Sequence, residues 1–313
     1  MSVDHFIREP WQKKSPNLAV FRVAQLLHEK TNGAFDKFYQ KCANLVNPAK
    51  TLPAPAMLDW NTIKTTVDSL NKDGCFVLPV KLSPTELQEI RDFAFSNPAY
   101  AKNISERINI RPDAIPTDHG RYMWKMETLT KLNAIQRLMQ DSSLHQIAQE
   151  YMGGACVLTS ITLWLDPVYK GEFDPHIYHY DNDGPKFLKF FFYITDVEPD
   201  TGAHKFIRGT HNHTKPEEFR ISKRYDENVL LNYWGKENEI VFAAPAGTIL
   251  AEDTAGFHRG STIKRDYRLL MQFQYALLDI PHEEELVNKI ARFPLPGLNK
   301  NIGAIVKKFY KAA

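Results

Sequence analysis

Residues 173–213, FDPHIYHYDNDGPKFLKFFFYITDVEPDTGAHKFIRGTHNH, hold five of the chain's eleven histidines around one long apolar segment. Within this stretch, His179 and Asp181 lie two residues apart on a segment predicted to be extended. Side chains in a strand alternate between its two faces, so these two point to the same face. One imidazole and one carboxylate supply two ligands of a facial site for a divalent metal such as iron(II). A third ligand must come from elsewhere in the chain.

The segment GFHRG at residues 256–260 offers that ligand. His258 follows a predicted strand at residues 248–251, and Arg268 comes ten residues later at the start of another predicted strand. Neighbouring antiparallel strands joined by a short loop bring His258 and Arg268 to one cavity. Arginine suits a bidentate clamp for a carboxylate. A His-x-Asp pair occurs by chance in many chains, but the four residues together predict a metal site with a dicarboxylate co-substrate.

The second half of the chain has the pattern of an all-β domain. Short β-rich segments are separated by turn sequences such as NDGP, DTG and PAG. This pattern favours a sandwich or barrel over alternating βαβ units. The predicted strands lie at residues 156–165, 187–197, 205–207, 229–233, 239–242, 248–251 and 269–278.

Helices are predicted to flank this β region on both sides. Apolar residues recur at helical spacing within residues 1–57, where Gly33 marks a break. Further helices are expected at residues 60–73, 84–95, 132–151, 282–292 and 302–310. We therefore expect a helical lead-in (1–57), a main domain with supporting helices (58–281) and a helical tail (282–313).

The composition excludes several classes of protein. The net charge of the 313 residues is only +2, which does not indicate a nucleic-acid partner. No apolar run is long enough to span a membrane, and the N-terminus lacks the apolar region of a signal peptide. Cys42, Cys75 and Cys156 show no metal-binding or disulfide spacing. These features predict a cytoplasmic protein.

The motifs resemble those of the phytanoyl-CoA dioxygenase family of iron(II)- and 2-oxoglutarate-dependent oxygenases. The resemblance covers about residues 60–280 and is densest from HYDNDG to GTHNH, with a second match in AGTILAEDTAGFHRG and the following YR. It departs from the family at Arg208, which stands where the family has a proline before its GSH segment. Residues 1–57 lie outside the resemblance.

The resemblance implies a mainly β fold with flanking helices, built on a double-stranded β-helix (jelly roll, cupin-like). It implies that His179, Asp181 and His258 bind iron(II) and that Arg268 binds the far carboxylate of 2-oxoglutarate. The expected reaction uses dioxygen to hydroxylate a small organic or acyl substrate, with release of succinate and CO2. Halogenating relatives have a small residue in place of the aspartate, so Asp181 favours hydroxylation.

Lys189 has two interpretations. In residues 187–195 the even positions are wholly apolar, whereas the odd positions include Lys189. If the odd face lines the barrel, Lys189 is an inward cation that needs a carboxylate partner, and 2-oxoglutarate would serve. Alternatively, the odd face is exposed at a sheet edge.

Other functions remain open at this stage. A non-oxygenase metal enzyme of the same fold, such as an isomerase or epimerase, would use the three metal ligands but would not need the arginine. A binding protein with a decayed site would need neither the ligands nor the arginine. His176, His211 and His213 are not expected to be ligands. Arg107, Arg111 and Arg121 suggest an anionic small-molecule substrate, although solvated loop arginines explain them equally well. The sequence does not indicate an oligomeric state.

Overall fold

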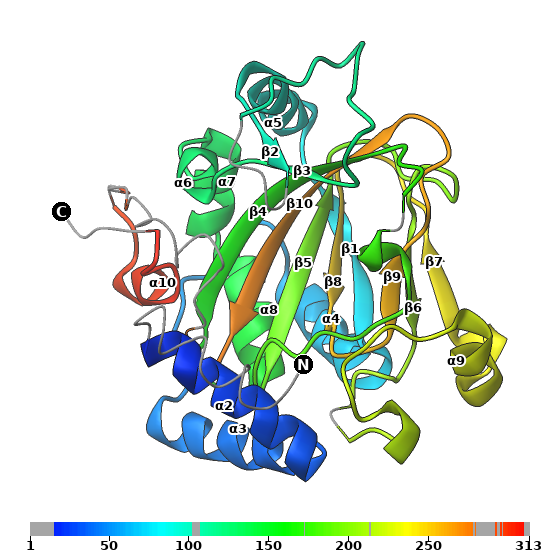
Figure 1. The fold of residues 1–313 in the computed structure, drawn as a ribbon. Helices are drawn as coiled ribbons and strands as arrows, with labels where there is room; N and C mark the ends of the chain where they lie inside the picture. Colours follow the sequence, from blue (N-terminus) through cyan, green and yellow to red (C-terminus); the bar gives the residue numbers. More distant parts are fainter. Residues whose placement is uncertain are drawn as a thin grey trace.

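The fold consists of two antiparallel sheets with helices packed around the larger one (Figure 1). It was obtained as a computed structural model, which describes residues 16–101, 107–171, 173–212, 214–277, 279, 292, 295 and 297–309. The α-helices are α2 (Pro16–Thr31), α3 (Ala34–Val46), α4 (Trp60–Asp73), α5 (Pro84–Ser96), α6 (Met126–Leu129), α7 (Asn133–Gln140), α8 (Ser142–Met152), α9 (Glu227–Trp234) and α10 (Lys300–Ile305). The strands are β1 (Cys75–Lys81), β2 (Tyr100–Ala101), β3 (Tyr122–Met123), β4 (Val157–Pro167), β5 (Phe187–Tyr193), β6 (His204–Ile207), β7 (Glu239–Phe242), β8 (Thr248–Glu252), β9 (His258–Gly260) and β10 (Tyr267–Ala276).

The strand order confirms the predicted mainly β fold of the jelly-roll type. The larger sheet has the order β1-β8-β5-β10-β4-β3-β2, and the smaller sheet has the order β7-β6-β9. The strand pairings between these elements are antiparallel. Strands distant in sequence become neighbours, because β10 pairs with both β4 and β5. The ribbon shows the smaller sheet beside β1 and β8 of the larger one (Figure 1).

Strand β5 separates two apolar cores. Leu188, Phe190 and Phe192 belong to the core between the larger sheet and its helices. Phe191 and Tyr193 belong to the core between the two sheets, together with residues of β6 and β7. The odd positions of β5 therefore line the interior between the sheets, which decides between the two interpretations of Lys189.

Local sequence signals explain the ends of several helices. The Asp59 side chain caps α4 by accepting a hydrogen bond from the Thr62 amide, and Gly74 ends the helix with a φ of 86°. A side chain at Gly74 would be strained at this φ and would also meet His211 and Phe206. Ser83 and Glu86 form a capping box at the start of α5.

Two predictions of secondary structure are wrong. The predicted strand at residues 229–233 lies within helix α9, because the Asp226 side chain accepts hydrogen bonds from the amides of Asn228 and Val229 and so caps a helix there. The predicted single helix at residues 132–151 is two helices. Asp141 lies between them in an extended conformation and ends α7. Its side chain accepts a hydrogen bond from the Ser143 amide and so caps α8.

The C-terminal region is described in part. The predicted helix at residues 282–292 lies outside the described residues, except for its last position. In the tail, α10 is short, and Ile302, Ile305 and Phe309 are buried against the main core. Lys308 is buried and pairs with Asp279 at 3.0 Å, so it is not part of a solvated face. Within the described part of the chain, no helix has the length and apolar character needed to cross a membrane.

Candidate metal centre

An antiparallel bridge brings His179 next to His258. The His179 amide donates to the His258 carbonyl at 3.1 Å, and the His258 amide donates back to the His179 carbonyl at 2.8 Å. The Asp181 amide continues this pairing by donating to the Thr254 carbonyl at 2.8 Å. Backbone pairing thus places one residue of the His-x-Asp pair directly opposite the histidine found 79 positions further along the sequence.

The two imidazoles are oriented in the same way. Nδ1 of His179 lies 2.8 Å from the Ile177 carbonyl, and Nδ1 of His258 lies 3.0 Å from the Gly256 carbonyl. A carbonyl at Nδ1 fixes the tautomer that leaves Nε2 unprotonated, as a metal ligand requires. Both Nε2 atoms face Asp181, at 3.9 Å for His179 and 3.6 Å for His258.

These three side chains form a compact group of ligand atoms. One ligand atom from each of His179, Asp181 and His258 lies within 4.8 Å of the other two. Two neutral imidazole nitrogens and one carboxylate on one side of a point are the donor set of a facial site for iron(II). The chemistry of this donor set therefore fits the metal that the sequence suggested.

Lys189 lies beside this group and makes two ion pairs. Its ammonium nitrogen is 2.6 Å from Asp181 Oδ2 and 2.8 Å from Asp183 Oδ2. Burial alone would raise the pKa of Asp181, but Lys189 and the two histidines outweigh it and lower that pKa. Burial would likewise lower the pKa of Lys189, but the two carboxylates raise it. Asp181 and Lys189 are thus both charged at neutral pH.

Burial keeps the imidazoles neutral. Desolvation, followed by the neighbouring His179, lowers the pKa of His258 to about 4. Desolvation also lowers the pKa of His179 and outweighs the opposing effect of Asp181. Neutral imidazoles are ready to bind a cation without first releasing a proton.

A second buried pair lies next to His258, and the sequence analysis did not anticipate it. The His204 ring stacks on the His258 ring with centroids 5.5 Å apart, and His204 Nε2 lies 2.9 Å from Glu252 Oε1. Burial raises the pKa of Glu252 to about 8. The sequence signal for this pair is an acidic residue at the end of the otherwise apolar segment TILAE.

The side chain of Arg268, which belongs to β10, lies beside Gly260, and Gly260 is two residues along β9 from His258. Its guanidinium donates to Asp166 Oδ2 at 2.6 Å and to the Gly202 carbonyl, while its Nε is buried without a hydrogen-bond partner. A Cβ atom at Gly260 would lie 3.2 Å from Arg268 Nη2, and one at Gly202 would lie 3.4 Å from Nε. The two glycines therefore let the backbone approach the guanidinium closely, and a side chain at either position would crowd it.

Asp166 holds two arginines at once. It lies opposite Arg268 in the β4–β10 pairing and also accepts from Arg121 Nε at 2.6 Å. Two guanidinium groups around one carboxylate leave an excess positive charge, which suits a second carboxylate. Asp166 was not anticipated either, although a lone aspartate at the end of VLTSITLWLD, a segment without other charged residues, is an available signal.

The remaining candidates lie outside the ligand group. His176 lies near Gly260 and Arg268, and its buried Nε2 has no hydrogen-bond partner. His211 packs against Gly74 instead, and His213 is outside the described residues. Arg111 pairs with Asp113 at the surface, and Arg107 lies over the Tyr100 ring. Of the three loop arginines, only Arg121 lies near the interior between the sheets.

A pocket of about 250 Å³ opens onto His179 and Asp181. Helix α2, which belongs to the lead-in where the sequence suggested no chemistry, provides part of its wall. The lining residues are Arg22, Gln25, Glu29, His179, Tyr180, Asp181, Asn182, Ser222 and Arg224.

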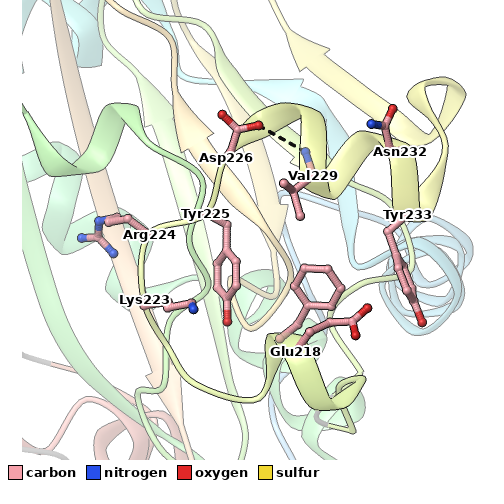
Figure 2. A pocket seen from close by; sticks show the side chains of 9 residues that line it. Glu218, Lys223, Arg224, Tyr225, Asp226, Val229, Asn232 and Tyr233 are labelled. Atoms are coloured by element: carbon pink, nitrogen blue, oxygen red, sulfur yellow. Dashed lines mark hydrogen bonds between the residues drawn. The ribbon is translucent and has the colours of Figure 1, made fainter.

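A larger cavity of about 640 Å³ lies on the other side of Arg224, under helix α9. Figure 2 shows Tyr225 and Tyr233 on its sides and Asp226 capping the helix above it. The Arg224 side chain points away from both tyrosine rings in this view. Arg224 is therefore shared by the walls of the two cavities.

Comparisons with known proteins show a likeness of fold. No family model matches the chain, and no curated protein matches it in sequence. The solved structure of EctD from S. alaskensis with bound Fe has a TM-score of 0.51 at 17% identity, covering 75% of this chain and 84% of that chain. The epimerase SnoN in complex with Fe3+, alpha ketoglutarate and nogalamycin RO has a TM-score of 0.50 at 15% identity, covering 77% of this chain and 93% of that chain.

Proposed function

We propose that this protein is an iron(II)- and 2-oxoglutarate-dependent dioxygenase that hydroxylates a small organic substrate. The observation that carries the proposal is the placement of a facial group of two histidines and one aspartate near a buried arginine whose Nε has no hydrogen-bond partner. In this proposal His179, Asp181 and His258 hold the metal. The main domain at residues 58–281 carries the activity, flanked by the lead-in and the tail.

The spacing along β9 supports a keto acid between the metal ligands and Arg268. His258 and Gly260 are two residues apart on one strand, so they share a face at a separation of roughly 6–7 Å. The Arg268 guanidinium lies over Gly260. In this proposal the metal would hold one end of a short dicarboxylate and Arg268 would bind its far carboxylate.

The protein's residues have separable roles in this scheme. When bound, iron(II) and 2-oxoglutarate supply the activation of dioxygen that oxidises a C–H bond, with succinate and CO2 as by-products. The Nδ1 contacts of His179 and His258 orient the imidazoles, and Arg268 with Asp166 positions the co-substrate. Lys189 balances the charge of Asp181 and Asp183. The pocket bounded by α2 admits the substrate on the side of His179 and Asp181.

Membership of the phytanoyl-CoA dioxygenase family is part of the proposal and rests on the motifs around His179 and His258. A second candidate is a 2-oxoglutarate-dependent epimerase with the same metal and co-substrate. The likeness of fold to SnoN, described as an epimerase, favours including it. The two candidates differ in product, because hydroxylation adds one oxygen atom to the substrate and epimerisation adds none.

The test begins without a known substrate. Purified protein is supplied with iron(II), 2-oxoglutarate and oxygen, and succinate is measured. Slow succinate formation that requires iron and is lost in His179→Ala supports the proposal. Absence of succinate across a panel of substrates, together with no binding of 2-oxoglutarate to the metal-loaded protein, contradicts it. The mass of the substrate after turnover then separates hydroxylation from epimerisation.

A further inference from the structure

Lys215 is a buried lysine whose ammonium group is bound by backbone carbonyls. Its nitrogen donates to the carbonyls of Thr210 at 2.5 Å, Asn212 at 2.7 Å and Ala255 at 2.8 Å. An ammonium group has three donors, so these contacts use all of them. The ammonium therefore joins the turn after β6 to the segment that leads to His258.

Two aromatic rings complete the surroundings of this ammonium group. It lies 5.0 Å from the centre of the Tyr180 ring and 5.6 Å from the centre of the Phe257 ring. The two rings meet edge to face, with centroids 5.5 Å apart. A cation over an aromatic ring is attracted by the partial negative charge of the ring face. The ammonium thus contacts one aromatic side chain from each of two segments.

These two segments carry all three proposed metal ligands. The tyrosine lies between His179 and Asp181, and the phenylalanine directly precedes His258. Side chains in extended segments alternate between two faces, so the two rings lie on the face opposite the ligands. Both rings accordingly belong to an apolar cluster that includes residues of α9. Lys215 therefore contacts the outer side of the two segments whose inner side would bind the metal.

The turn after β6 supports His258 by a second route. The Thr210 hydroxyl accepts a hydrogen bond from the Phe257 amide at 2.8 Å and donates to the Ile207 carbonyl at 2.6 Å. Residues 209–211 (GTH) resemble a family motif, yet none of them belongs to the ligand group of the described residues. Their turn instead holds the backbone next to a ligand and binds the ammonium of the buried lysine.

The lead-in fixes the backbone of Lys215. The Asn32 side chain donates to the Lys215 carbonyl at 2.9 Å and accepts from the Lys215 amide at 3.0 Å. In α2, Gln25 Nε2 donates to the carbonyl of Asn182, the residue after Asp181, at 2.6 Å. The lead-in is thus anchored both at the lysine and directly beside one of the proposed ligands.

We propose that Lys215 is a positioning residue for the metal site, because its ammonium group holds the segment of His179 and Asp181 in register with the segment of His258. It acts through the backbone and the two aromatic rings, and it does not touch the metal. This inference rests on the proposed function, since it concerns the geometry of the same three ligands.

The first experiment replaces Lys215 in the full-length protein loaded with cobalt(II), whose visible spectrum reports the geometry of its ligands. Lys215→Met removes the charge and the donors but keeps a long apolar side chain. We expect this variant to bind cobalt(II) about tenfold more weakly or worse, with a shifted spectrum. Lys215→Arg should recover part of both losses, because a guanidinium keeps the charge and can donate to several carbonyls.

Lys308→Met is the matched control. Lys308 is also buried, but it pairs with Asp279 in the C-terminal region. Its substitution should lower stability and leave the cobalt(II) affinity and spectrum unchanged. Unchanged affinity and spectrum in Lys215→Met, or the same changes in Lys308→Met, would overturn the inference.

The parent protein supplies a test that needs no substitution. Burial lowers the pKa of Lys215 to about 7. The ammonium is therefore lost as pH rises through this value, and the neutral amine keeps only two donors. We expect the cobalt(II) affinity of the parent to fall, and its spectrum to shift, across about one pH unit on either side of this pKa. Constant affinity and spectrum over this range would overturn the inference, whether or not the variants fold.

Other charged and titratable groups near Lys215 are separated by the same comparison. Asp253 favours the charged lysine and Lys186 opposes it, and these two groups pair with each other at 2.9 Å. Burial lowers the pKa of His211, so it stays neutral. Burial raises the pKa of Glu252 to about 8, so this group titrates in the same range.

The comparison of the parent with Lys215→Arg isolates the lysine. Glu252 is present in both proteins, whereas only the parent loses a positive charge at position 215. The parent should therefore show the larger pH dependence, and identical profiles would overturn the inference. Full cobalt(II) affinity in His179→Ala would instead defeat the proposed function itself. Loss of affinity in His179→Ala with unaffected Lys215 variants defeats the inference alone.

Discussion

The ammonium nitrogen of Lys189 lies 2.6 Å from Asp181, the only carboxylate in the candidate ligand group of the described residues. The lysine is buried, and its other partner is Asp183 at 2.8 Å. A metal ion and Lys189 therefore compete for the same negative charge. Lys189 places a positive charge on the same carboxylate that a metal would bind.

Lys189→Met should make stability depend more strongly on metal. Removing one partner of a buried ion pair costs about 3–5 kcal/mol, because the other charge is left uncompensated. A divalent cation restores the missing charge, so manganese(II) should raise the free energy of unfolding of the variant more than that of the parent. Urea denaturation with and without metal measures this difference.

Lys205→Met is the control for that measurement. Lys205 pairs with Glu227 and Glu239, which are not in the ligand group. Its substitution should lower stability without changing the increment due to metal. An equal increment in Lys189→Met and the parent would contradict the competition described above.

Substitution of the proposed ligands should abolish metal binding while leaving the fold intact. His179→Ala, His258→Ala and Asp181→Ala should each weaken the binding of iron(II) by at least about 10²-fold, since each removes one of three protein ligands. Equilibrium dialysis against nickel(II) or iron(II) measures this. His211→Ala should retain the parent affinity, because His211 packs against Gly74 and not in the ligand group. Full affinity in His179→Ala would rule out the assignment.

Arg268→Met should weaken the binding of 2-oxoglutarate much more than the binding of metal. Loss of a buried charge-assisted pair costs about 2–5 kcal/mol, which is roughly 30-fold or more in affinity. Arg268→Lys should recover only part of this loss, because a lysine cannot form the bidentate pair. Arg121→Met, which also removes a partner of Asp166, should have the smaller effect on 2-oxoglutarate. Titration of the metal-loaded protein with 2-oxoglutarate measures these affinities.

Gly260→Ala tests the close approach of β9 to Arg268 without changing any charge. Gly260 lies in strand β9 and is not among the glycines with positive φ, so alanine is compatible with its backbone. The added Cβ would lie 3.2 Å from Arg268 Nη2. We expect the KM for 2-oxoglutarate to rise by about tenfold with an unchanged metal content. An unchanged KM would mean that the co-substrate does not bind beside Gly260.

Protonation of His145 should lower the free energy of unfolding at acid pH, whether or not metal is bound. Its Nε2 lies 2.9 Å from the Met139 carbonyl, and its Nδ1 lies 2.9 Å from the Tyr275 hydroxyl. Burial lowers its pKa from 6.5 to about 4. Between these values the unfolded chain binds more protons than the folded chain, so stability falls as pH falls from 6.5 towards 4.

The full effect of His145 is about 3 kcal/mol. His145→Gln should therefore have a shallower decline of the free energy of unfolding across this pH window, whatever its stability at pH 7. Urea denaturation at a series of pH values compares the two proteins. If the free energy of unfolding fell equally with pH in both proteins, the pKa of His145 would not differ between the folded and unfolded states.

The alternation of side chains between the two faces of a strand made much of the fold predictable. The apolar even positions of β5 and the turns around it follow from residue order alone, as does the common face of His179 and Asp181. The helix α9 was missed because Val229, Leu230 and Tyr233 favour a strand, whereas the cap at Asp226 decides the outcome. A short local signal overrode the average preference of the segment.

The surroundings of the site were less predictable, because they depend on long-range pairing. Asp166 meets Arg268 across 102 positions of sequence, and no local pattern indicates that register. Helical spacing showed that the lead-in has a buried side but not that this side faces the metal ligands. Lys189 was recognised as a cation in need of a partner, but its nearest partner is Asp181 itself.

The anchoring of α2 also has a consequence for biosynthesis. Its partners Asn182 and Lys215 follow Gln25 and Asn32 by 157 and 183 residues. A ribosome releases this helix before its partners, so the helix has no docking surface there until residue 182 has emerged. Contacts that span so much sequence form late in folding. The wall over His179 therefore closes only after residues 182 and 215 have been made, and the first two proposed ligands, His179 and Asp181, are synthesised before that wall is fixed.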